Sequence, residues 1–171
     1  GGPPRRRASH GQRAQAATRG ANAGDGNRRP GRGSAGRARL SLIAVDASAI
    51  LEVLLRTDRG DRVEDRLLSR GESLHAPHLL DVEVAQVLRR YAAAGRLTSE
   101  RGLEALADLS DLPIHRYPHD VLLPRIWELR HNVTAYDAAY LALAETLAAP
   151  LVTCDGRLAS APGHAARVEV Y

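Results

Sequence analysis

The chain has 171 residues, enough for one domain of ordinary size, and 44% of them are hydrophobic although only 4% are aromatic. A single Cys excludes an internal disulfide framework, and no run approaches the roughly 18 apolar residues that a membrane helix needs. We therefore expect a cytoplasmic protein without a membrane segment, whose core is built from Leu, Val, Ile and Ala.

Charge divides the chain near residue 40. Residues 1–40 hold ten Arg and one Asp, a charge of +9, in a background of Gly, Ala, Pro and Ser without hydrophobic periodicity. Such a composition buries too little apolar area to offset the entropy of ordering, so we expect a disordered tail. An Arg-rich RNA-binding arm is the functional alternative, and a mis-assigned start would explain both the tail and the absence of Met. Residues 41–171 hold 14 Arg and 19 acidic residues, so the domain itself is acidic, with a charge of −5.

After residue 40, short apolar runs alternate with amphipathic stretches. The first half predicts a buried strand at 42–45, helices at 48–56 and 60–70, a weak strand at 74–76 stopped by Pro77, and a helix at 79–94. The last of these carries a clear apolar stripe and ends at Gly95.

The second half continues the alternation. It predicts helices from Thr98 or Ser99 to about 110, at 120–131 and at 135–148, and strands at 114–117, 151–154 and 168–171. Strands alternating with helices predict one α/β domain over residues 41–171, with a parallel sheet of about five strands flanked by helices. Ligands of such sheets bind at the carboxyl ends of the strands.

Two aspartates directly follow predicted strands. Asp46 follows the first strand and Asp155 follows a later one, so both are expected where such a sheet binds its ligands. Each has a structural alternative, because Asp46 can cap a helix and the Asp-Gly pair at Asp155 favours a turn. Taken singly, the structural alternative is the commoner outcome for each residue.

Asp137 lies in a helix that is apolar almost all round. It shares a face with Tyr140, Leu141 and Ala144, where an unpaired carboxylate is costly unless a cation or hydrogen bonds compensate it. Thr134 and Asp137 also resemble a capping box, with Asp in place of Glu. Capping and ligand binding are compatible, since one carboxylate oxygen can cap the helix while the other binds a metal ion.

Glu83 borders the apolar stripe of its helix, in the first turns after Pro77. It can therefore face the strand ends, or it can be a solvated residue paired with Arg90. Asp81 is a nearby competitor, and the spacing of the two acids does not separate them.

Taken together, the four acids predict a site for a hard divalent cation. Carboxylates are ligands that Mg²⁺ and Mn²⁺ prefer, whereas four carboxylates converging without a cation would repel one another. Zinc is not expected, because the chain has neither a CxxC pair nor an HExxH motif. The chain also lacks a G-x-S-x-G elbow, a P-loop and a G-x-G-x-x-G loop.

Four segments of the chain resemble the PIN-domain family, and within it the VapC toxins of bacterial toxin–antitoxin pairs. They are collinear, the resemblance covers about residues 41–171, and the third is the most specific. The segments are VDASA at 45–49, PHLLDVEVAQVLRR at 77–90, TAYDAAYLALAE at 134–145 and LVTCDGRL at 151–158.

The resemblance implies a toxin that is a Mg²⁺- or Mn²⁺-dependent ribonuclease. It assigns the family's four acids to Asp46, Glu83, Asp137 and Asp155, and so favours Glu83 over Asp81. Ser48 and Thr153 match positions where the family often has a hydroxyl near the metal. The implied partners are an RNA substrate, a cognate antitoxin and a second copy of the chain in a homodimer.

The resulting hypothesis is hydrolysis of RNA phosphodiester bonds. Asp46, Asp137 and Asp155 would hold one or two ions, and Glu83 would position a metal or water. A non-catalytic PIN-like module that binds RNA or protein is the main alternative. A phosphatase with Asp46 as nucleophile is disfavoured, because the second Asp that such enzymes carry two residues later is here Ser48. We expect Leu54, Leu55 and Trp127 in the core rather than at an interface.

Overall fold

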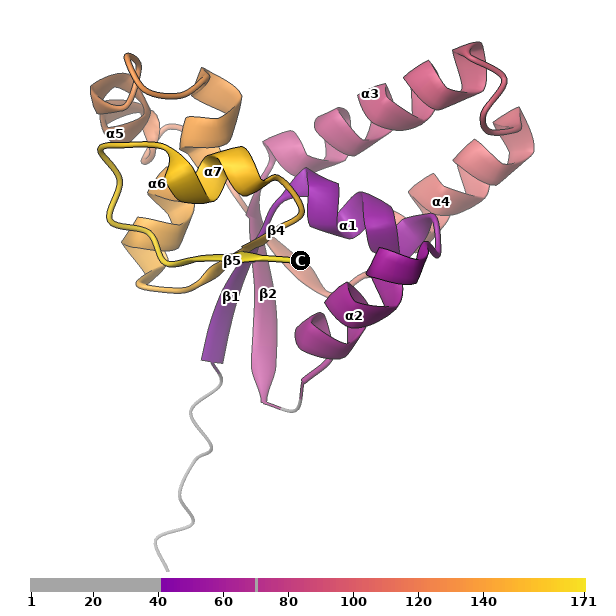
Figure 1. The fold of residues 1–171 in the computed structure, drawn as a ribbon, viewed down its shortest axis with the longest axis horizontal. Helices are drawn as coiled ribbons and strands as arrows, with labels where there is room; N and C mark the ends of the chain where they lie inside the picture. Colours follow the sequence, from indigo (N-terminus) through magenta and orange to yellow (C-terminus); the bar gives the residue numbers. More distant parts are fainter. Residues whose placement is uncertain (1–40, 70) are drawn as a thin grey trace, which may run out of the picture. The chain divides into compact units, whose positions relative to one another are not determined.

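The computed structural model describes residues 41–69 and 71–171 (Figure 1). The expected tail at 1–40 lies outside these residues. No helix within them is long and apolar enough to cross a membrane. The elements in chain order are β1 (Ser41–Val45), α1 (Ala47–Leu54), α2 (Asp58–Leu67), β2 (Glu72–Pro77), α3 (Leu79–Ala93), α4 (Ser99–Asp111), β3 (Ile114–Tyr117), α5 (Leu123–Glu128), α6 (Ala135–Leu147), β4 (Leu151–Thr153), α7 (Gly156–Ser160) and β5 (Val168–Val170).

The five strands form one parallel sheet in the order β3-β2-β1-β4-β5. The predicted α/β fold with about five parallel strands is thus confirmed. Val45 pairs with Val152, so β1 and β4 end side by side in the middle of the sheet. This register brings Asp46 next to Thr153, although 107 positions separate them in sequence.

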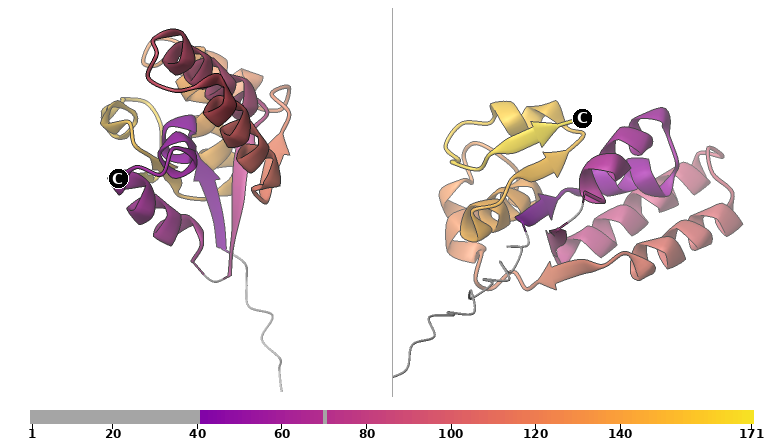
Figure 2. Two further views of the ribbon diagram at one scale, coloured as in Figure 1. Left: turned by 90° about the vertical axis from the view of Figure 1, so that its right-hand side faces the viewer. Right: turned by 90° about the horizontal axis from the view of Figure 1, so that it is seen from below.

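The helices lie on both sides of the sheet, with α1 to α4 gathered on one side and α5 to α7 on the other (Figures 1 and 2). The core is aliphatic, as the composition predicted, and Ile43, Ile50 and Leu80 are completely buried in it. Helix α6 is the most deeply buried helix segment of the described residues, because every residue from Ala138 to Ala144 is buried. That burial fixes the helix whose first turn carries Asp137.

Several predicted boundaries differ from the structure. Strand β2 begins two residues before its predicted start and includes Pro77, which lies beyond His75, the last residue of β2 that pairs with β1. Helix α1 ends at Leu54, and Arg56 takes a left-handed conformation with φ of 52°. Helix α5 begins at Leu123, three residues later than expected.

One helix and one exposed side chain were not anticipated. The Asp-Gly pair at 155–156 favoured a turn, whereas the structure continues into the short helix α7. Leu54 is buried and Leu55 packs against the core, as predicted. The prediction for Trp127 was wrong, because its side chain is 69% exposed on α5, a helix with no buried residue.

Candidate active site

Asp46 sits at the carboxyl end of β1 and caps the N-terminus of α1. Its residue surface is only 7% exposed. Its Oδ2 atom accepts hydrogen bonds from the Thr153 hydroxyl at 2.8 Å and from the hydroxyl and backbone N–H of Ser48. The capping role predicted as the structural alternative is therefore real, and it leaves the carboxylate at the end of the sheet.

Two hydroxyl groups link the ends of β1 and β4. Ser48 Oγ lies 3.1 Å from Thr153 Oγ1 and accepts the backbone N–H of Cys154 at 2.9 Å. Thr153 Oγ1 accepts the backbone N–H of Asp155 at 2.9 Å, and the residue is completely buried. The two hydroxyls thus hold Asp46 and the backbone of Asp155 in one hydrogen-bonded group.

Glu83, on α3, is tied to α6 on the other side of the sheet. Its Oε2 atom accepts the hydroxyl of Tyr140 at 2.8 Å, and Tyr140 is only 1% exposed. No ion pair between Glu83 and Arg90 exists in the structure as described, so the alternative of an Arg90 partner was wrong. Asp81 instead pairs with Arg116 of β3 at 2.9 Å, so the two competing acids have different neighbours.

Asp137 and Asp155 line the same hollow, which has a volume of about 480 Å³. Asp137 and Thr134 form the anticipated cap: the Thr134 hydroxyl donates to Asp137 Oδ2 at 2.8 Å and accepts the Asp137 N–H at 3.1 Å. Asp155 caps α7 and forms an ion pair with Arg157 at 2.5 Å.

Burial, hydrogen bonds and neighbouring charges shift the pKa of three of these acids. Burial raises the pKa of Asp46, against hydrogen bonds from Ser48 and Thr153 that lower it. Burial also raises the pKa of Glu83; the Tyr140 hydrogen bond opposes this shift, and the charges of Asp46 and Asp137 add to it. Hydrogen bonds from Arg157 lower the pKa of Asp155. Glu83 therefore lies within electrostatic range of both Asp46 and Asp137.

The donor chemistry of the site fits a hard divalent cation. Asp46, Glu83 and Asp137 receive hydrogen bonds from hydroxyl groups, and none forms an ion pair with an Arg or His of the described residues. Carboxylates that lack a cationic partner leave a negative charge for an ion such as Mg²⁺ to balance. As the side chains stand, however, no three His, Cys, Asp or Glu groups of residues 41–69 and 71–171 come close enough together to hold an ion.

Two contacts of the acids were missed from sequence. Tyr140 was placed on the face of Asp137 by its i+3 spacing, but nothing in the sequence connected it to Glu83 on another helix. Arg157 lies only two residues beyond Asp155, and this short spacing was the available signal for their ion pair. We infer that Tyr140 holds Glu83 in place and that Arg157 holds Asp155 in place.

A family model described as the PIN domain matches residues 43–163. This chain belongs to the PIN-domain family. Ribonuclease VapC12 of Mycobacterium tuberculosis is 42% identical over 129 residues, which cover 75% of this chain and 98% of that protein. Membership of the VapC type, indicated by the four sequence segments, is thus confirmed.

Two solved structures share the fold. PAE2754 from Pyrobaculum aerophilum superposes with a TM-score of 0.57 at 26% identity, covering 77% of this chain and 85% of that one. VapBC2 from Rickettsia felis, solved bound to a DNA fragment from its promoter, gives a TM-score of 0.57 at 11% identity, covering 75% and 98%. At 11% identity the likeness concerns the fold alone.

Proposed function

We propose that this PIN-domain protein is a metal-dependent endoribonuclease and the toxin of a toxin–antitoxin pair. The observation that carries the proposal is Asp46, a buried carboxylate without an ion-pair partner among the described residues, at the ends of the two central strands. It occurs in a chain 42% identical to a protein named a ribonuclease. Oxygen donors at this end of a parallel sheet suit the cleavage of a phosphodiester.

Asp46, Asp137 and Asp155 are the residues that would hold Mg²⁺ or Mn²⁺, and Glu83 would position a metal or a water. A divalent ion bound there would lower the pKa of its water and offset the charge of the phosphate. Ser48 and Thr153 orient the Asp46 carboxylate through hydrogen bonds to Oδ2. These bonds fix the carboxylate before substrate arrives, and such fixed geometry lowers the entropic part of the barrier.

The partners proposed for the chain are RNA, a cognate antitoxin and a second copy of the chain. The antitoxin is supported by the VapC type of the sequence. Copurification of this chain with the product of an adjacent small gene tests the antitoxin. The mass of the purified chain in solution tests the second copy.

Replacement of Asp137 by Asn tests the proposed activity. The substitution keeps the shape of the side chain and its acceptor for Thr134, but removes the charge that a cation would need. We expect cleavage of an RNA pool in Mg²⁺ to fall by at least about 100-fold, the scale of losing one group that stabilises a transition state. The far-UV circular dichroism spectrum should not change.

Asp81→Asn is the matched control, because Asp81 is an acid whose partner is Arg116 rather than a hydroxyl of the site. It should cleave RNA at the wild-type rate, and chelation by EDTA should silence both wild type and control. Undiminished cleavage by Asp137→Asn would show that Asp137 does not take part in the reaction.

A non-catalytic module that binds RNA or protein is the second candidate. The observation that favours it is the Asp155–Arg157 ion pair, which engages the fourth acid without a metal. Binding of RNA without any metal-dependent cleavage by the wild-type chain would select this candidate.

A further inference from the structure

A hollow lies beside the acids, where the connection between α5 and α6 faces α7. Its lining includes Asp137 and Asp155 together with Arg130, His131 and Arg157. The two Arg of the hollow balance its two Asp, whereas residues 41–171 as a whole carry 19 acidic residues against 14 Arg. An acidic domain that binds a polyanion needs positively charged side chains at the place where the polyanion binds.

Arg130 is the basic residue of the hollow whose charge is free among the described residues. Its Nη1 atom donates to the Trp127 carbonyl at 2.8 Å, and its guanidinium lies 4.8 Å from the centre of the Trp127 ring. These contacts orient the guanidinium without neutralising it. By contrast, Arg157 pairs with Asp155, and the nearby Arg125 pairs with Glu145 and Glu128.

The wall that carries Arg130 is held in place by its neighbours. Arg125 bonds Glu145 of α6 and the carbonyl of Gly163, and so ties α5 to the segment before β5. At Gly163, where φ is +89°, a Cβ would lie within 3.0 Å of the Asn132 side chain, so the two segments are closely packed there. The backbone that carries Arg130 is therefore packed against its neighbours.

We propose that this hollow binds a phosphate of the RNA strand next to the one that is cleaved, with Arg130 as the principal contact and His131 beside it. The inference rests on the proposed function for its ligand, single-stranded RNA. A planar guanidinium donates two parallel hydrogen bonds to phosphate oxygens, and its place in the lining beside Asp137 puts that phosphate within a nucleotide or so of the acids.

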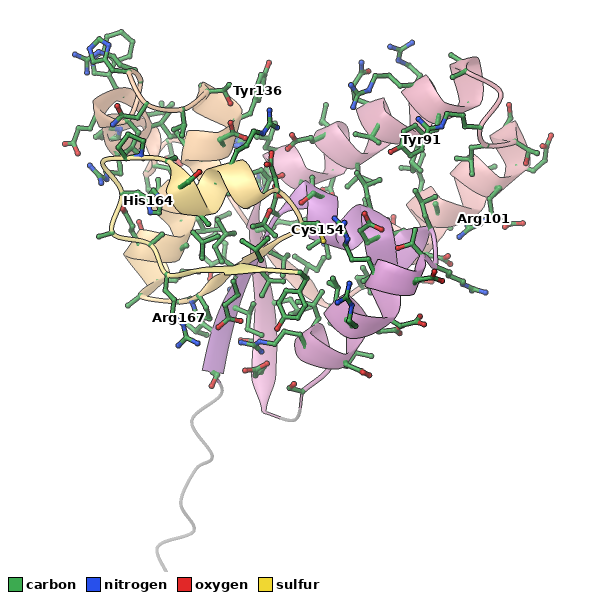
Figure 3. The ribbon with its side chains drawn as sticks, in the orientation of Figure 1. Tyr91, Arg101, Tyr136, Cys154, His164 and Arg167 are labelled. Atoms are coloured by element: carbon green, nitrogen blue, oxygen red, sulfur yellow. The ribbon has the colours of Figure 1, made fainter. Side chains whose placement is uncertain are left out.

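A matched pair of variants tests the proposal. Arg130→Ala removes the charge at the hollow, whereas Arg96→Ala removes an exposed guanidinium that stacks on Tyr91 at 4.7 Å. Each variant loses one positive charge and one contact between an Arg and an aromatic ring, so the two change the net charge equally. Tyr91 marks the part of α3 that leads to its turn with α4, well away from α5 to α7 (Figure 3).

Affinity for a labelled single-stranded RNA is measured by fluorescence anisotropy, in an Asp137→Asn background with EDTA so that the strand stays intact. We expect Arg130→Ala to weaken binding about fivefold or more at low salt, and to reduce the slope of log affinity against log salt by about 1. Arg96→Ala should leave both quantities unchanged.

Two outcomes would overturn the proposal. Unchanged RNA affinity in Arg130→Ala would assign the hollow to a protein partner or to no ligand. Equal losses of RNA affinity in both variants would show that the effect comes from the change in net charge alone. Failure of the ribonuclease proposal shows elsewhere, as absence of Mg²⁺-dependent cleavage by the wild-type chain, so the two failures are distinguishable.

Discussion

His75 is a buried histidine that the proposed active site does not use. It lies on β2, 5% exposed, with Nδ1 2.9 Å from the Tyr117 hydroxyl and Nε2 2.8 Å from Ser73 Oγ. Its ring stacks on His115 of β3 at 5.0 Å. Burial lowers the pKa of His75 below its ordinary value of 6.5, and the charge of His115 lowers it further. The folded state therefore prefers neutral His75.

The depressed pKa predicts how stability depends on pH. Below pH 6.5 the unfolded chain takes up a proton at His75 before the folded chain does, so the free energy of unfolding falls as pH drops from 6.5 toward the folded pKa. His75→Gln keeps polar atoms at the position but removes this titration. We expect urea unfolding of the variant to show a shallower decline between pH 7 and 5.5. Identical declines would show that other groups cause the wild-type dependence.

At the scale of elements, helix packing is controlled by close backbone approach. Gly60 is buried in α2 where this helix meets α1, and a Cβ there would lie within 3.0 Å of the backbone carbonyl oxygen of Glu52. That carbonyl cannot move freely, because it also accepts the N–H of Thr57. Gly102 is also buried, in α4, but a Cβ there would meet only the Leu97 side chain at an ordinary 3.6 Å.

The two glycines predict opposite responses to the same substitution. Gly60→Ala forces α1 and α2 apart and should lower the free energy of unfolding by about 2 kcal/mol, in the range of overpacking. Gly102→Ala should leave it unchanged or raise it by about 0.5–1 kcal/mol, because Ala reduces the entropy lost when the helix forms. Urea unfolding measures both. A similar loss in both would show that the α1–α2 contact is not the cause.

At the scale of the whole domain, one arginine joins elements from distant parts of the sheet. Arg66 of α2 pairs with Glu72 of β2 and, at 2.8 Å, with Glu169 of β5. Strands β1 and β4 lie between these two strands, so the interaction spans most of the sheet. All three side chains are at most 20% exposed, which makes the network stronger than a surface ion pair.

Loss of Arg66 should therefore destabilise the domain as a unit. Arg66→Met leaves two half-buried carboxylates without their shared cation, and we expect a loss of about 2 kcal/mol, between the values for surface and buried pairs. Arg167 also pairs with Glu169 but is 78% exposed, so Arg167→Met should cost less than about 1 kcal/mol. Equal urea midpoints for the two variants would contradict the role given to burial.

The sequence by itself determined the fold class and the candidate acids. The alternation of short apolar runs with amphipathic helices is a local property, so it predicted the parallel α/β sheet that the structure shows. The segments around Asp46, Glu83, Asp137 and Asp155 carried the resemblance that the family model and the VapC relative confirmed. The roles of these acids, by contrast, stay predictions.

Only the tertiary structure decided which distant side chains meet. The bond from Tyr140 to Glu83 joins helices α6 and α3, and the bond from Thr153 to Asp46 follows from the register of β1 and β4. Sequence periodicity assigns a side chain to a face but does not choose the partner across that face. The exposure of Trp127 and the free charge of Arg130 likewise depend on how α5 packs, since an apolar or charged residue type does not fix its own neighbours.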